Sequence, residues 1–486
     1  MEEHKSLKKN VLFNGMLSFA GIAFPLVTTP YISRVLDISD IGVINHGSAF
    51  ASLFISVASL GLSGYASREI ARVRSDRGKV SHVFWSVLAI HFLSSVLIVL
   101  FYVGYVQLCV GDERLRHVLL IYAAMVAAKP FEVEWLYTGL EEFKYISLRS
   151  ITIKTVMFLL LFVLVRDESD FLWYAVLLVC AQSANGFYNL IHSRKYVNRP
   201  CLRLGIKNVL SCSKYFYFQV LVAVCYQYAN QIFLGNTNES ELALFVRAAS
   251  LTAIIQSVVN TVLNALKPRV EHVFVKNLEG CREYIDKGFS LVMFILFPMC
   301  FGLAALSEEA MRLFGGAQFV GGGTVLRIAA LSAFITNLSV FFNNIVSTPA
   351  GFEKNTMFGN IAVAVVSLAL NPFLARRYGG TGAATALLAA EAAGLLVHAA
   401  LAFKEHLYLK FVSPRLCRYA VSALAMYAFI CLVRTRISSP VVSVLVCVPS
   451  AAVLYAGLCF LLMKISDDKG DHVFAFVESC LMRIRR

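Results

Sequence analysis

An apolar stretch near residue 130 contains two opposite charges at a spacing that brings them together. Lys129 and Glu132 flank Pro130 and lie three residues apart, on one face of a helix. A charged group at bilayer depth costs at least about 2.5 kcal/mol, so it usually faces a cavity or a partner. The pair therefore forms either a structural ion pair beside the proline or a substrate or proton site. Glu134, two residues further on, lies nearer the end of the stretch.

A second carboxylate, Glu391, lies in the middle of a stretch of small residues and is followed seven residues later by His398. A lone glutamate there predicts either packing against a neighbouring helix or coupling to a cation. Glu132 and Glu391 are our candidate coupling residues, because a carboxylate that is desolvated can exchange a proton.

Further polar side chains lie within or at the ends of apolar stretches. Singly, each cation is typical of an anchor that extends toward the membrane surface. Together they would form a cationic cavity, since guanidinium groups bind phosphate oxygens in bidentate geometry. The substrate-binding candidates are Arg34, Arg68, Lys129, Arg247 and Arg327, and the sugar-contact candidates are Asn14, Gln227 and Asn230. Polar packing between helices is the competing interpretation for Gln227 and Asn230.

The composition indicates which kind of fold positions these candidate residues. Hydrophobic residues make up 58% of the 486 residues, charged residues only 15%, and the mean hydropathy is +0.69. This pattern excludes a disordered or ordinary soluble chain and predicts an all-α polytopic membrane protein with about 14 transmembrane helices. Pro25 and Pro30 predict an interrupted first helix, which is either a moving gate or a static kink. The expected spans are 11–33, 42–66, 82–106, 118–139, 151–165, 171–191, 215–234, 242–265, 288–311, 325–349, 357–375, 382–403, 419–435 and 441–463.

Charge and spacing predict the topology and two lobes. Most Lys and Arg residues fall in alternate loops, so both termini should be cytoplasmic. Each half reaches a short acidic outside turn after one span, residues 37–40 and 238–241. We expect an N-terminal lobe of spans 1–6 (residues 1–205), a C-terminal lobe of spans 7–12 (206–410), and two C-terminal spans with a cytoplasmic tail (411–486). Two such bundles are typical of alternating-access transporters.

Several function classes are disfavoured. The chain has no phosphate-binding GxxxxGK[ST] motif, and its twelve cysteines show no metal-ligand spacing. No loop exceeds about 25 residues, which leaves no room for a soluble catalytic domain. We therefore expect a protein that is not an enzyme, without catalytic residues, cofactor or metal. The net charge of +14 reflects cytoplasmic loops rather than a nucleic-acid partner.

Several short segments along the chain form motifs in a characteristic order. They are Ser6-Leu7-Lys8-Lys9-Asn10, Pro30-Tyr31-Ile32-Ser33-Arg34, Ser67-Arg68-Glu69-Ile70-Ala71, Phe131-Glu132-Val133-Glu134-Trp135, Leu313-Phe314-Gly315, Gly351-Phe352-Glu353-Lys354 and Gly379-Gly380-Thr381-Gly382. Their order resembles the bacterial oligosaccharide-unit flippases, the Wzx-type branch of the multidrug/oligosaccharidyl-lipid/polysaccharide (MOP) superfamily. The similarity covers most of residues 6–404. The chain departs from the pattern close to Asn230, where many relatives carry an acidic residue.

This resemblance implies a MATE-like fold, two six-helix lobes with a cavity between them plus two C-terminal helices, in the inner membrane of a bacterium. It implies transport of undecaprenyl-diphosphate-linked oligosaccharide units from the inner to the outer leaflet for O-antigen, lipopolysaccharide, capsule or exopolysaccharide synthesis. We further expect a monomer, with a polysaccharide polymerase and the chain-length machinery as protein partners.

Two other classes stay open. One is a cation-coupled multidrug antiporter of the same fold, although cationic drugs would favour an acidic cavity and the charges here are mixed to basic. The other is a membrane-bound polysaccharide polymerase or acyltransferase, although polymerases usually need a long outside loop.

Overall fold

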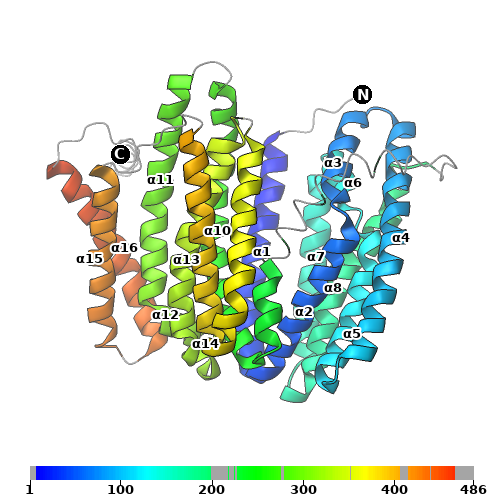
Figure 1. Ribbon diagram of the computed structural model, residues 1–486, viewed down its shortest axis with the longest axis horizontal. Coiled ribbons are helices and arrows are strands. Elements are labelled where there is room, and N and C mark those ends of the chain that lie inside the picture. Colours follow the sequence, from blue (N-terminus) through cyan, green and yellow to red (C-terminus); the bar gives the residue numbers. More distant parts are fainter. Residues whose placement is uncertain are drawn as a thin grey trace. The chain divides into compact units, whose positions relative to one another are not determined.

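The computed structural model describes residues 7–198, 227–274, 278–350, 352–404, 414–437 and 439–465, together with residues 209, 217 and 224. Within these residues the secondary structure is helical, without strands (Figure 1). The chain divides into two compact units, Met1–Ala243 and Leu244–Arg486. The lobe boundary expected at residue 205 stays a prediction, because it lies outside the described residues.

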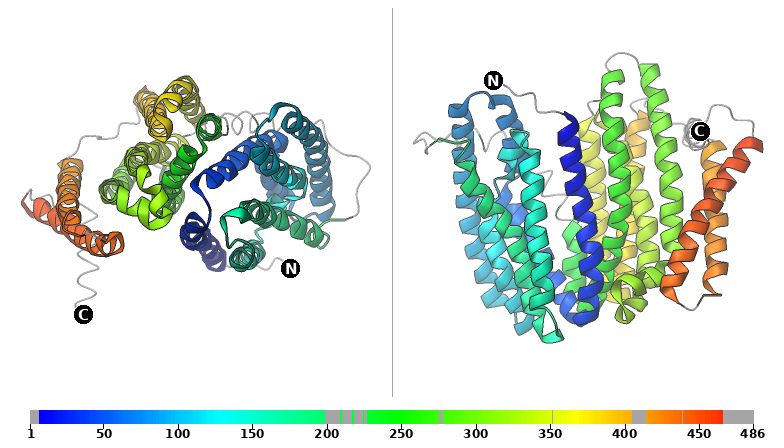
Figure 2. Two further views of the ribbon diagram at one scale, coloured as in Figure 1. Left: turned by 90° about the horizontal axis from the view of Figure 1, so that it is seen from below. Right: turned by 180° about the vertical axis from the view of Figure 1, so that it is seen from behind.

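Unit 1 is a bundle of helices that run along one common direction (Figures 1 and 2). Its elements are α1 (Leu7–Val35), α2 (Ile38–Ser59), α3 (Leu62–Val73), α4 (Arg77–Cys109), α5 (Glu113–Ala128), the 3₁₀ turn η1 (Lys129–Phe131), α6 (Glu134–Gly139), α7 (Phe143–Leu164), the 3₁₀ turn η2 (Glu168–Asp170) and α8 (Phe171–Ser193). Helix α10 (Glu239–Phe274) begins in unit 1 and continues into unit 2.

Unit 2 is also helical. Its remaining elements are α11 (Leu278–Ala305), α12 (Ser307–Gly315), the 3₁₀ segment η3 (Ala317–Gly322), α13 (Gly323–Phe341), the π-helical turn η4 (Phe342–Ser347), α14 (Glu353–Lys404), α15 (Pro414–Arg434) and α16 (Pro440–Ile465).

The described part of the chain contains 10 helical segments long and apolar enough to cross a membrane. The all-α polytopic class is therefore confirmed, whereas the number 14 stays a prediction. Most of the expected seventh span, 215–234, lies outside the described residues. Helix α4 shows the character expected in lipid, because Leu93, Leu97 and Leu100 on its surface are exposed.

The first span differs from expectation. Helix α1 continues across both Pro25 and Pro30 instead of being interrupted there. The C-terminal part of α1 is bonded to the residue that follows α7, since the Tyr31 hydroxyl donates to the Val165 carbonyl at 2.7 Å. Proline within a membrane helix is tolerated when neighbouring groups compensate for the lost backbone hydrogen bond.

The expected eleventh and twelfth spans are the two arms of α14. Gly379 separates them with φ 58° and ψ −136°, a conformation that is accessible to glycine and strained for other residues. The backbones of the two arms approach closely where the chain reverses. This approach requires a second glycine, because a Cβ at Gly382 would overlap the Leu374 carbonyl. Gly359 on the first arm faces His398 on the second, so the arms run antiparallel.

The expected fourth span is broken in the middle. Helix α5 ends at Ala128, η1 follows, and α6 begins at Glu134. Tight turns satisfy the backbone: Glu132 N donates to the Lys129 carbonyl at 3.1 Å and Val133 N to the Phe131 carbonyl at 2.8 Å. Pro130 causes the break, because proline has no N–H to continue the hydrogen-bond ladder of the helix.

Candidate functional site

A polar pocket of about 510 Å³ opens beside this break in unit 1. We call it the broken-helix pocket. Its walls come from α3, from the residues between α5 and α6, from α6 itself, from the start of α7 and from the second half of α8. Its volume falls in the range of small-molecule sites. Gly186 lets α8 approach closely, since a Cβ there would lie 3.1 Å from the Phe131 carbonyl carbon.

The predicted pairing of Lys129 with Glu132 is present in this pocket. Lys129 Nζ lies 2.7 Å from Glu132 Oε2, and both side chains are largely buried. The break in the helix changes the geometry that the sequence suggested, because the two residues meet across a 3₁₀ turn rather than along a regular α-helix. Both line the pocket.

Arg149 forms the second ion pair of the pocket. Its Nη2 lies 2.6 Å from Glu134 Oε2, with the arginine side chain 3% exposed and the glutamate 51% exposed. Nε donates to Asn185 Oδ1 at 3.0 Å, and Nη1 donates to Asn189 Oδ1. The three partners fix the plane of the guanidinium, which also lies over the Tyr145 ring.

A further set of hydrogen bonds holds the partners of Arg149 in place. Asn185 Nδ2 donates to the Ala181 carbonyl at 2.8 Å, which turns its Oδ1 toward the guanidinium. The Tyr137 hydroxyl donates to the Asn189 carbonyl at 2.6 Å, and Tyr137 packs on Tyr145 with ring centroids 4.6 Å apart. The pocket wall is therefore preorganised by packed and hydrogen-bonded side chains.

The other cationic candidates of unit 1 do not line the broken-helix pocket. Arg34 is exposed, and its Nη1 donates to the Pro30 carbonyl of its own helix at 2.6 Å. Arg68 is exposed on α3, next to the pocket residue Ser67. Of the five substrate-binding candidates, only Lys129 contributes to this pocket.

The two candidates of unit 2 lie near its 3₁₀ segment and α12. Arg247 is buried, with its guanidinium carbon 5.0 Å from the centroid of the Phe319 ring. Arg327 Nη2 lies 3.4 Å from Glu308 Oε1, and both side chains are more than one-third exposed. An exposed pair of this kind contributes little to stability.

The sugar-contact and coupling candidates have different surroundings. Gln227 is exposed, Asn230 is buried, and the side chain of Asn14 lies outside the described residues. Glu391 is buried in the second arm of α14, within reach of a hydrogen bond with Thr336 of α13. The register of the α14 arms, in which Val363 faces Gly394, places the buried Ser367 almost opposite Glu391.

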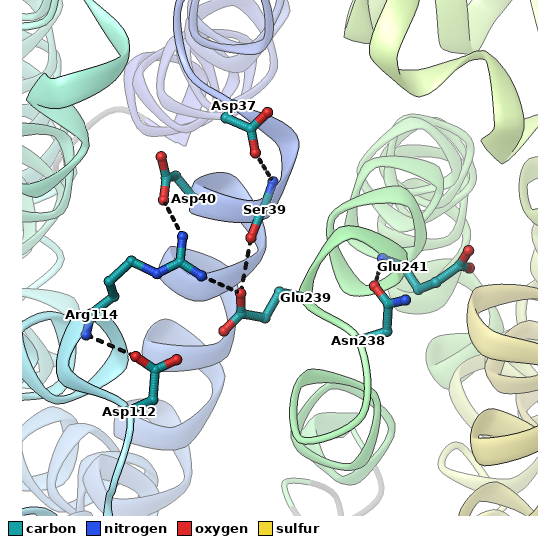
Figure 3. Close-up of polar contacts among 8 residues, drawn as sticks. All are labelled: Asp37, Ser39, Asp40, Asp112, Arg114, Asn238, Glu239 and Glu241. Carbon is teal, nitrogen blue, oxygen red and sulfur yellow. Dashed lines mark hydrogen bonds and ion pairs between the residues drawn. The ribbon is translucent and has the colours of Figure 1, made fainter.

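A second polar cluster joins the two acidic turns noted in the sequence (Figure 3). Arg114 at the start of α5 bridges them: Nη1 lies 3.2 Å from Asp40 Oδ1 and Nη2 3.3 Å from Glu239 Oε2. The Ser39 hydroxyl donates to the same glutamate at 3.0 Å. A Cβ at Gly42 would overlap the Glu239 backbone, so α2 and the start of α10 are in close contact.

The sequence reading did not select Arg149, Gln182, Asn185 or Asn189. A signal for three of them was present, because Gln182, Asn185 and Asn189 recur at spacings of three and four in the otherwise apolar α8 and so share one helical face. Arg149 carried no such signal, since it stands close to the predicted end of a span, where arginine is usually an anchor.

These features define a class: a multi-pass α-helical membrane protein with paired charges buried in its N-terminal unit. The solved structures with a similar fold include a flippase and a multidrug transporter. The lipid II flippase MurJ, in an inward closed conformation, has a TM-score of 0.75 and 13% identity, with 93% of this chain and 99% of that chain covered. An inward-facing multidrug resistance MATE family transporter of the MOP superfamily has a TM-score of 0.54 and 15% identity, with 80% and 99% covered.

A family model described as polysaccharide biosynthesis protein matches residues 7–274, which is more than half of the chain. The chain therefore belongs to this family. It is also 23% identical over 403 residues to the "Putative O-antigen transporter" of Escherichia coli K12, covering 79% of this chain and 94% of that protein. The family resemblance expected from the motifs is confirmed.

Replacement of Arg149 by lysine tests whether the guanidinium organises the broken-helix pocket. An ammonium group cannot satisfy Glu134, Asn185 and Asn189 together, so we expect Arg149→Lys to lower the free energy of unfolding by about 1–3 kcal/mol. The measurement is thermal unfolding of the purified protein in detergent. Arg72→Lys is the control, because Arg72 is 68% exposed and pairs only with Glu69 on its own helix. Equal melting temperatures for the two variants would contradict the assigned role.

Proposed function

We propose that this protein is a flippase for lipid-linked oligosaccharides. It moves undecaprenyl-diphosphate-linked repeat units from the inner to the outer leaflet for O-antigen, capsule or exopolysaccharide synthesis. The observation that carries the proposal is the match of residues 7–274 to the polysaccharide biosynthesis family. A relative named "Putative O-antigen transporter" supports it, because the alignment with this chain covers 94% of that relative. The protein acts as a transporter without enzymatic activity, in the cytoplasmic membrane, with both termini in the cytoplasm.

The distribution of polar groups is compatible with this cargo. A lipid-linked unit combines an apolar tail, an anionic diphosphate and an uncharged sugar chain. The exposed apolar helix faces suit lipid, and the cationic candidates outside the broken-helix pocket, Arg34, Arg68, Arg247 and Arg327, suit the diphosphate. We assign the diphosphate of the cargo to these cations, and alternating access moves the cargo.

The energy source in this proposal is an ion gradient or the membrane potential, since the sequence has no nucleotide-binding motif. Glu391 is the stronger coupling candidate. It is buried and not part of an ion pair among the described residues, whereas the carboxylate of Glu132 is already paired with Lys129.

Leaflet exchange in reconstituted vesicles tests the function directly. Lipid-linked repeat units are extracted from the source strain and incorporated into vesicles with or without the purified protein. An impermeant lectin that recognises the repeat unit then reports the fraction in the outer leaflet. We expect the inner-leaflet pool to become accessible only in vesicles that contain the protein. Equal exposure with and without the protein would refute the flippase assignment.

The same vesicles test the coupling residues under an imposed pH or sodium gradient. We expect Glu391→Gln to lose the response to the gradient while its melting temperature stays close to that of the parent protein. Glu132→Gln should instead lose thermal stability, because it leaves the Lys129 ammonium without its carboxylate. Glu113→Gln, an exposed residue in the first turn of α5, is the control. An unchanged gradient response of Glu391→Gln would exclude Glu391 and favour a potential-driven mechanism.

A further inference from the structure

We propose that the broken-helix pocket binds an uncharged, hydroxyl-rich group, a sugar residue of the cargo, rather than its diphosphate. This inference rests on the proposed flippase function and assigns a part of the cargo to a site inside unit 1. It differs from the sequence expectation, in which Lys129 contributed to phosphate binding and the sugar contacts lay at Asn14, Gln227 and Asn230.

The charge balance of the pocket favours an uncharged ligand. Its walls carry two cations, Lys129 and Arg149, and two carboxylates, Glu132 and Glu134, which form two ion pairs at 2.7 and 2.6 Å. The formal charge of the lining is therefore zero. A diphosphate would have to displace both carboxylates from their cations and would leave them beside the phosphate oxygens, where like charges repel.

The pocket also offers polar side chains that have no partner in the described part of the chain. The hydroxyls of Ser63, Ser67 and Ser150 and the amide of Gln182 line it and make no hydrogen bond to another described residue. Serine hydroxyls and a glutamine amide each donate and accept hydrogen bonds. Sugar hydroxyls do the same, whereas ionised phosphate oxygens only accept. The available groups thus match a sugar better than a phosphate.

The carboxylates add acceptors in a suitable position. Glu134 is 51% exposed although one of its oxygens is held by Arg149, so it keeps lone pairs that point to accessible space. Asn185 and Asn189 are committed to the guanidinium and keep it from turning toward a ligand anion. An arginine that is held by three groups acts as a rigid wall of the site rather than as a free phosphate ligand.

Binding of two lipids that differ only in the sugar tests the inference. The probes are undecaprenyl diphosphate and the undecaprenyl-diphosphate-linked repeat unit from the source strain, and the readout is the Kd of the full-length protein in nanodiscs. The test variant is Gln182→Leu with Ser67→Ala. The control variant is Gln107→Leu with Ser52→Ala, which carries the same changes in α4 and α2 away from the pocket.

We expect the parent protein and the control variant to bind the glycosylated lipid more tightly than the bare diphosphate lipid. The test variant should lose about tenfold in affinity for the glycosylated lipid and keep its affinity for the bare lipid, because two hydrogen-bonding groups are removed. Melting temperatures of both variants verify folding.

Three results would overturn the inference. They are an unchanged sugar preference in the test variant, an equal loss for both lipids, and the absence of a sugar preference in the parent protein. If vesicles with the parent protein still exchange the cargo between leaflets, any of these results removes the sugar site while the flippase function stands.

Discussion

The guanidinium of Arg149 is almost fully buried inside a helical bundle that lies in a membrane, and it must therefore be paired. Its three partners come from two helices that are distant in the sequence: Glu134 at the start of α6, and Asn185 and Asn189 on α8. Removing any of them leaves a buried donor with less compensation, which costs free energy. The need to pair the buried Arg149 guanidinium therefore constrains how α6, α7 and α8 pack together.

The break between α5 and α6 positions further charged residues at the broken-helix pocket. Pro130 interrupts the helix, and the interruption places Lys129, Glu132 and Glu134 along one wall of the pocket. Non-helical backbone at membrane depth is tolerated where it lies against protein or a polar cavity. Gly139 and Gly186 permit close packing around the break. A Cβ at Gly139 would overlap Ile70, and one at Gly186 would lie 3.1 Å from the Phe131 carbonyl carbon.

Much of this was predictable from local pattern. The apolar spacing of the chain indicated most of the helices, and the i, i+3 spacing of Lys129 and Glu132 indicated their ion pair. The gap between the expected spans 357–375 and 382–403 falls on Gly379, where α14 reverses. Such features depend on residues close in sequence, for which periodicity and turn chemistry are sufficient.

The rest depended on contacts between distant residues. Arg149 and Asn189 are 40 positions apart, and no single-sequence pattern states that α7 and α8 bring them together. Helix α1 is continuous across Pro25 and Pro30, and the Tyr31 hydroxyl bonds to the Val165 carbonyl just after α7, a contact between residues 134 positions apart. The acidic turns at Asp40 and Glu239 are far apart in the sequence, and only the folded structure shows their contact, through the Arg114 bridge and the Ser39–Glu239 hydrogen bond.

In the proposed mechanism, a pocket with compensated charges in unit 1 receives the sugar portion of a lipid-linked cargo. An experimental structure of the full-length protein with the lipid-linked repeat unit bound tests this most directly. We expect density for a sugar ring beside Gln182 and Ser67, with the Arg149–Glu134 and Lys129–Glu132 pairs intact. Phosphate density in contact with Arg149, with Glu134 displaced, would contradict it.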